Sequence, residues 1–217
     1  MAERFSQPHD PYIQDRTTRQ RTPQPQATED PKGTFHFVTW RLADSIPQDY
    51  LHQWQAERKQ WLRTHPKPWD ETTAEDYRTR FPKRLERWLD KSYGACHLRN
   101  PYCADFVRRA MRASDGEHYT LATYVIMPNH VHTLVHLPHG EDLESIVQEW
   151  KSYSTRKING LLHRKEPLWH TENWDHVLHN TAQLQRCREY IAQNPVTADL
   201  REDEFLHYVS PVFIPEY

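Results

Sequence analysis

Two histidines that flank a valine are the residues whose types and spacing most directly permit chemistry. His130 and His132 lie on either side of Val131, in a stretch rich in β-branched residues. Because side chains alternate across a strand, both imidazoles would project from one face while Val131 points to the other. Two imidazoles about 7 Å apart on one strand can share a divalent metal ion. The chain has 15 histidines, so such a pair also arises by chance, and spacing alone leaves both interpretations open.

A tyrosine and an asparagine form a second pair near the C-terminus. Leu184, Cys187 and Ile191 recur at helical spacing as an apolar stripe, and Tyr190 and Asn194 lie at its edge, over one patch of a sheet. In the functional interpretation Tyr190 is a nucleophile and Asn194 an oxygen ligand of the metal. In the structural one, Tyr190 is a half-buried core residue and Asn194 ends the helix. A phenol has a pKa near 10, so this nucleophile would suit a phosphodiester polarised by a cation.

A basic stretch offers a candidate DNA-binding surface. Lys151, Arg156 and Lys157 stand beside Trp150 and Tyr153, and positive charge next to aromatic rings suits single-stranded DNA. The same helix carries its acids early and its bases late, which the helix dipole also favours. An ordinary solvated face therefore remains an alternative for these three residues.

The elements that must position these residues follow from periodicity and turn signals. A strand is predicted over 34–42, and a β-hairpin over 118–138 that turns at Pro128-Asn129. The last helix is expected to end near Asn194, since Pro195 disfavours helical geometry in the residue before it. Further segments complete the order: helices after Pro47, around 81–91, over 101–113 and over about 143–162, a polar surface excursion at 64–76, and an aromatic segment at 167–180.

This order of elements predicts an α+β fold. We expect a ferredoxin-like antiparallel sheet with helices packed mainly on one face, and with the histidine pair on a central strand. Residues 1–33 hold five prolines and little apolar periodicity, which predicts a disordered or loosely attached N-terminal arm. Residues 34–217 are expected to form a single domain with a helical insertion around 64–113.

Composition excludes several classes of site. The five glycines, at 33, 94, 116, 140 and 160, are at least twenty positions apart. A dinucleotide fingerprint, a Walker phosphate loop and a nucleophile elbow each need clustered glycines, so all three are excluded. There is no run of 18 apolar residues and no secretory signal pattern, so no membrane association is expected. Three cysteines without an export signal predict reduced thiols and a cytoplasmic location.

Several segments together resemble a known family. YVIMPNHVHTLVHLP, WKSYSTRKINGLL, PLWHTENWDHVLHN and YIAQNPVTADL are similar, in order and spacing, to the REP-associated tyrosine transposases, which are single-tyrosine HUH transposases. HUH denotes His, a bulky apolar residue, and His. The resemblance covers roughly residues 34–200, and the combination of MPNHVH with YIxxNPV is specific. The family usually has glycine where this chain has Asp199, a residue that accepts left-handed backbone geometry better than most.

The resemblance implies an activity and a site. His130 and His132 match the HUH histidines, which with Asn194 would bind Mg²⁺ or Mn²⁺, and Tyr190 matches the catalytic tyrosine. The expected reaction cleaves single-stranded DNA beside a hairpin, such as a repetitive extragenic palindrome, through a 5′-phosphotyrosine intermediate, and it can be reversed without ATP. The protein is expected to be nucleoid-associated when bound to DNA, as a monomer or homodimer.

The sequence is also compatible with two other functions. One is a hairpin-DNA-binding protein that keeps the transposase fold without catalysis. The other is a hydrolase in which His130 and His132 hold a metal-bound water, which would act without Tyr190 and leave no covalent intermediate.

Overall fold

The computed structural model describes residues 33–211, so the predicted arm over 1–33 lies, except for its last residue, outside the described part. Among the helices of residues 33–211, none combines the length and apolar character that crossing a bilayer would require. The elements are β1 (Thr34–Arg41), α1 (Gln48–Thr64), α2 (Glu71–Arg80), α3 (Pro82–Asp90), η1 (His97–Arg99), α4 (Pro101–Arg112), β2 (Thr120–Ile126), β3 (His130–Leu137), α5 (Leu143–Leu161), β4 (Trp174–Leu178), α6 (Thr181–Thr197) and β5 (Leu206–Val209).

One antiparallel sheet organises the molecule. Its strand order is β4-β1-β3-β2-β5, and every neighbouring pair is antiparallel. The first four strands have the ferredoxin-like order, with α4 on the crossover between β1 and β2 and α5 on the crossover between β3 and β4. The predicted fold class is confirmed. The edge strand β5 was not predicted, because four residues give too short a pattern to recognise.

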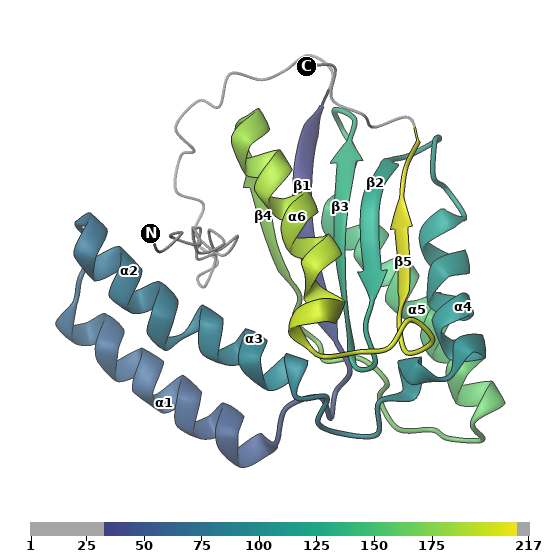
Figure 1. Cartoon of the computed structure of the whole chain (residues 1–217), viewed down its shortest axis with the longest axis horizontal. Helices are drawn as coiled ribbons and strands as arrows, with labels where there is room; N and C mark the ends of the chain where they lie inside the picture. Colours follow the sequence, from purple (N-terminus) through teal and green to yellow (C-terminus); the bar gives the residue numbers. More distant parts are fainter. Residues whose placement is uncertain (1–32, 212–217) are drawn as a thin grey trace, which may run out of the picture.

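Helices cover both faces of the sheet, with α4 and α5 behind it and α6 in front in Figure 1. Successive side chains of β3 point alternately to the two faces of the sheet. Val131 and Val135 are fully buried in the core that includes residues of α4 and α5. Leu134 is buried instead with Cys187 and Ile191 of α6. His130 and His132, in phase with Leu134, therefore project toward the face that α6 covers.

The last helix is longer than predicted. α6 runs through Pro195 to Thr197, whereas an end near Asn194 was expected. Proline has no N–H to donate and its ring crowds the preceding turn, but near the helix end this disturbs a single step of the ladder, and the N–H of Ala198 again donates to the C=O of Asn194. Asp199 closes the turn with φ of 52°, in the left-handed region.

The helices α1, α2 and α3 form a projection beside the β4 edge of the sheet (Figure 1). Trp61, Tyr77 and Phe81 are buried in its own small aromatic core. Part of the segment expected as a polar excursion is helical, because the side chain of Asp70 caps α2 by accepting from the N–H of Thr73. The insertion expected around 64–113 overlaps this projection but also includes α4, which belongs to the ferredoxin-like core.

Candidate active site

His130 is fixed in one orientation at the start of β3. Its Nδ1 donates to Oδ1 of Asn129 at 2.7 Å. The Asn129 amide is itself held, because its Nδ2 donates to the carbonyl oxygens of Leu89 and Tyr93. With the proton on Nδ1, Nε2 carries a free lone pair. Burial lowers the pKa of His130 to about 3, opposed by the side chain of Asn194, so the ring is neutral near pH 7.

His132 is held in a similar way from the neighbouring strand. Thr39 lies opposite His132 in the β1–β3 ladder, and its Oγ1 is 2.7 Å from Nδ1 of the imidazole. The ring centroids of His130 and His132 are 4.7 Å apart. Burial, followed by the proximity of His130, holds the pKa of His132 well below its usual range. The sheet therefore presents two neutral imidazoles side by side.

Asn194 brings an oxygen to these rings from α6. It is 4% exposed, and its Oδ1 is buried without a hydrogen-bond partner, as is Nε2 of His130. Both atoms are acceptors and cannot bond to one another, whereas a divalent cation would satisfy both. Two imidazoles and an amide oxygen suit Mg²⁺ or Mn²⁺ less than a set of carboxylates would, but they leave coordination positions for phosphate and water. Within residues 33–211, no three His, Cys, Asp or Glu side chains form a group that could hold a metal ion, so Asn194 would be needed as the third ligand.

Tyr190 lies on the same helix, one turn before Asn194. Its ring centroid is 5.2 Å from that of His132 and 5.8 Å from that of Phe37. Its Oη donates to Oε1 of Glu86, on α3, at 3.1 Å. The ring is half-buried, packed against the α6-side core. The structure therefore brings together the four residues that the sequence singled out: His130, His132, Tyr190 and Asn194.

A buried arginine also adjoins the site. Arg41 of β1 lies opposite His130 in the ladder, so the two side chains project from the same face. It is 1% exposed; its Nη1 donates to the carbonyl oxygen of Leu42 and to Ser45, while Nε and Nη2 are buried without partners. Burial lowers the pKa of Arg41 to about 10, opposed by Glu172, so the guanidinium stays charged near pH 7.

The three basic residues of α5 do not join this site. Because α5 packs on the opposite face of the sheet, Arg156 and Lys157 are exposed far from the histidines' face, and the Lys157 ammonium lies 5.8 Å from the centre of the Tyr153 ring. Lys151 is buried, and its Nζ donates to the carbonyl oxygens of His170 and Thr171. Its position favours a role in holding the loop before β4, and does not favour the predicted DNA contact.

Four residues of the site were missed by sequence reasoning. Asn129 was interpreted only as a turn residue, although its place next to His130 is a signal for a partner that orients the ring. Thr39 and Arg41 were interpreted only as part of a strand, and Glu86 only as part of a helix. Their roles depend on pairing between distant segments, which no local pattern reveals.

Comparisons with known proteins find similarity to transposases. Residues 97–194 match the family model described as "Transposase IS200 like". A curated protein of Haemophilus influenzae (strain ATCC 51907 / DSM 11121 / KW20 / Rd), named "Putative REP-associated tyrosine transposase", is 28% identical over 109 residues, which cover 44% of this chain. The match spans 62% of the length of that relative.

Two solved structures are also similar. A REP-associated tyrosine transposase bound to a REP hairpin has a TM-score of 0.42 and 17% identity, over 76% of this chain and 68% of that one. A protein of Deinococcus radiodurans R1, described as a "putative transposase", has a TM-score of 0.36 and 15% identity, over 75% of this chain and 91% of that one. The family match and the curated relative confirm the resemblance to the REP-associated tyrosine transposases, and residues 97–194 are similar to the IS200-like transposase family.

Proposed function

We propose that this protein is a transposase-type endonuclease and strand transferase that cleaves single-stranded DNA beside a hairpin. Tyr190 is the nucleophile, and His130, His132 and Asn194 hold Mg²⁺ or Mn²⁺. The partner is single-stranded DNA with a hairpin, of the kind that repetitive extragenic palindromes form. The protein would act in the cytoplasm, on nucleoid DNA, as a monomer or homodimer.

One observation carries this proposal. Nε2 of His130 and Oδ1 of Asn194 are buried acceptors without hydrogen-bond partners, and the ring of His130 packs against a second imidazole, His132, which in turn packs against the ring of Tyr190. An unpaired buried acceptor costs free energy, so two of them at one place indicate a site built for a cation. A site for a cation next to a phenol suits phosphodiester chemistry.

Within this proposal, each side chain has a role that its geometry supports. Asn129 and Thr39 orient the imidazoles. Because Tyr190 and Asn194 are one turn apart on α6, the nucleophile and a metal ligand keep a fixed separation. Oη of Tyr190 attacks phosphorus, the P–O3′ bond breaks, and the products are a 5′-phosphotyrosine and a free 3′-OH. When bound, the metal ion would neutralise charge that develops on the phosphate oxygens.

Reversal of the same step joins a new strand. The 3′-OH of another DNA end attacks the phosphotyrosine, and Oη of Tyr190 leaves. The phosphodiester energy is kept in the covalent bond, so the transfer requires no nucleotide cofactor. The absence of a glycine-rich phosphate loop from the sequence agrees with this.

A denaturing gel tests the proposal. The purified protein is mixed with labelled single-stranded hairpins from the DNA that flanks its own gene, with Mg²⁺, with Mn²⁺ or with EDTA. We expect a protein-linked DNA band that requires the metal and that Tyr190→Phe abolishes. The matched control is Tyr153→Phe, which removes a phenol hydroxyl from α5 on the opposite face and should still form the band.

The other outcomes identify the alternatives. A hairpin that shifts on a native gel without any adduct would indicate a non-catalytic hairpin-binding protein. Cleavage that survives Tyr190→Phe and leaves no adduct would indicate a metal-dependent hydrolase, and would overturn the role of Tyr190.

A further inference from the structure

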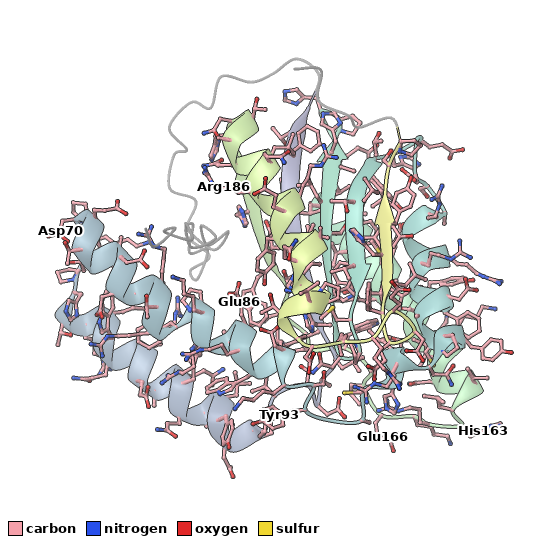
Figure 2. The ribbon with its side chains drawn as sticks, viewed as in Figure 1. Asp70, Glu86, Tyr93, His163, Glu166 and Arg186 are labelled. Atoms are coloured by element: carbon pink, nitrogen blue, oxygen red, sulfur yellow. The ribbon has the colours of Figure 1, made fainter. Side chains whose placement is uncertain are left out.

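The carboxylate that contacts Tyr190 comes from outside the segment that matches the family. Glu86 lies on α3, in the projecting helices, and the family match begins at residue 97. Oη of Tyr190 donates to Oε1 of Glu86 at 3.1 Å, across 104 residues of sequence. Figure 2 labels Glu86 where α3 lies next to α6. The projection therefore reaches the hydroxyl that the proposed reaction uses.

The fold holds α3 firmly in this position. Leu85 and Leu89, on one face of α3, are buried with Ile46 and Leu51, and Trp174 of β4 packs against the same cluster. The C-terminal end of α3 is also tied to the metal site, because the amide of Asn129 donates to the carbonyl oxygens of Leu89 and Tyr93 while its Oδ1 accepts from His130. The position of Glu86 is therefore coupled to that of the histidines.

We infer that Glu86 is the general base for Tyr190, an inference that rests on the proposed function. As Oη forms its bond to phosphorus, the phenol proton passes to the Glu86 carboxylate, the P–O3′ bond breaks, and the departing 3′ oxygen takes a proton from solvent. In the reverse step the Glu86 carboxylic acid returns the proton to Oη. A phenol is largely protonated near pH 7, so a carboxylate already bonded to its proton removes a barrier to attack.

Other ionisable groups surround this pair without replacing it. Burial lowers the pKa values of His132 and His176, so these rings are weak bases, and burial raises the pKa of Asp90, one turn after Glu86, to about 6. The charged neighbours one turn or less away along the two helices are Lys83, Arg84, Arg87, Arg186, Arg188 and Glu189. Glu86 differs from these groups because it accepts a hydrogen bond from Oη of Tyr190, the atom that attacks phosphorus in the proposed reaction.

Substitutions at position 86 separate proton transfer from orientation. Glutamine keeps an oxygen that can accept the hydrogen bond from Tyr190, but it is not a base. Under single-turnover conditions with saturating hairpin DNA and Mg²⁺, we expect Glu86→Gln to slow adduct formation about 100-fold or more, with the Kd for the hairpin changed less than threefold. We expect Glu86→Ala to be equally slow, and acetate or formate at high concentration to restore part of its rate.

The control is Glu189→Gln, which makes the same chemical change at an exposed carboxylate next to Tyr190 that accepts from Gln185 rather than from the phenol. It should leave the rate of adduct formation unchanged. Two results would overturn the role of Glu86 but leave the proposed function intact. One is a wild-type rate of adduct formation in Glu86→Gln, and the other is a slow Glu86→Ala variant that no small carboxylate rescues. A wild-type protein that forms no adduct at all would overturn the proposed function, and this inference with it.

Discussion

At the scale of single residues, the candidate site gathers buried hydrogen-bond acceptors, which suit a bound cation. Two buried imidazoles are kept neutral by burial, and each has one nitrogen committed to a neighbour, Asn129 or Thr39. A neutral imidazole with its other nitrogen fixed is the form that binds metal ions, and its partner commonly strengthens binding. The proposed metal site would therefore depend also on Asn129 and Thr39, which orient its ligands.

Removing either imidazole should separate chemistry from DNA binding. We expect His130→Ala and His132→Ala to abolish adduct formation while hairpin affinity stays within about threefold, because the metal serves the reaction more than the grip on DNA. A denaturing gel measures the first property and a native gel the second. The control is His52→Ala, at an exposed position on α1. A parallel loss of hairpin binding would mean that the imidazoles support the DNA-binding surface instead.

Arg41 should matter for the reaction more than for stability. Two of its guanidinium nitrogens are buried without partners, and Arg41 lies opposite His130 in the β1–β3 ladder, so we expect a phosphate oxygen of the substrate to satisfy them. A hydrogen bond to a charged group contributes about 1.5–3 kcal/mol, so we expect Arg41→Met to slow adduct formation about 10- to 100-fold. Because an incompletely paired buried charge is costly, the Tm should not fall. The exposed Arg63→Met is the control. A large drop in Tm would assign Arg41 a structural role.

At the scale of elements, much of the fold could be predicted because the signals are local. The alternation in 118–138 indicates the hairpin of β2 and β3, and the stripe through Cys187 and Ile191 indicates α6. α2 gave no such signal, because it is polar nearly all round and is stabilised by its Asp70 cap and by ion pairs from Arg78 to Glu71 and Glu75. Periodicity detects a buried face, and this helix buries little.

The candidate site could be predicted only in part, for a related reason. His130, His132, Tyr190 and Asn194 belong to short motifs whose spacing is visible along the chain. Glu86 belongs to none, since its contact with Tyr190 depends on how α3 packs beside α6. Lys151 shows the opposite case: its charge pattern predicted an exposed cation, whereas the loop before β4 folds over it.

The turn that ends α6 offers a test at this scale. Asp199 has φ of 52°, and beside it the N–H of Leu200 donates to the C=O of Pro195. Glycine fits this geometry and a β-branched residue does not. We expect Asp199→Val to lower the free energy of unfolding by about 1–2 kcal/mol, and Asp199→Gly to change it by less than about 0.5 kcal/mol. Urea denaturation measures both. Equal losses in the two variants would indicate that the Asp199 side chain, and not the backbone, stabilises the turn.

At the scale of the whole molecule, the sheet separates two kinds of surface. The α6 face carries the imidazoles, Tyr190 and Arg41, whereas the exposed bases Arg156 and Lys157 lie on α5, on the far face. DNA that reaches the histidines would therefore approach over α6 and the projecting α3, and not along α5. The net charge of −2 gives no uniform positive field, so attraction of the proposed DNA partner would have to come from local groups.

The buried histidines of that face also make the stability of the fold depend on pH. Burial, with smaller contributions from His36 and His179, lowers the pKa of His176 on β4 to about 4, against 6.5 in an unfolded chain. Between pH 4 and 6.5 the unfolded state binds more protons, so the contribution of His176 is complete above pH 6.5 and is lost as the pH falls toward 4. The slope of this contribution to the free energy of unfolding is at most about 1.4 kcal/mol per pH unit.

We therefore expect the Tm of His176→Gln to fall less steeply than that of the wild type as the pH is lowered from 6.5 to 4. The control, His52→Gln at an exposed position, should retain the wild-type slope. Identical slopes in the wild type and His176→Gln would show that His176 is as free to bind protons in the folded protein as in the unfolded chain.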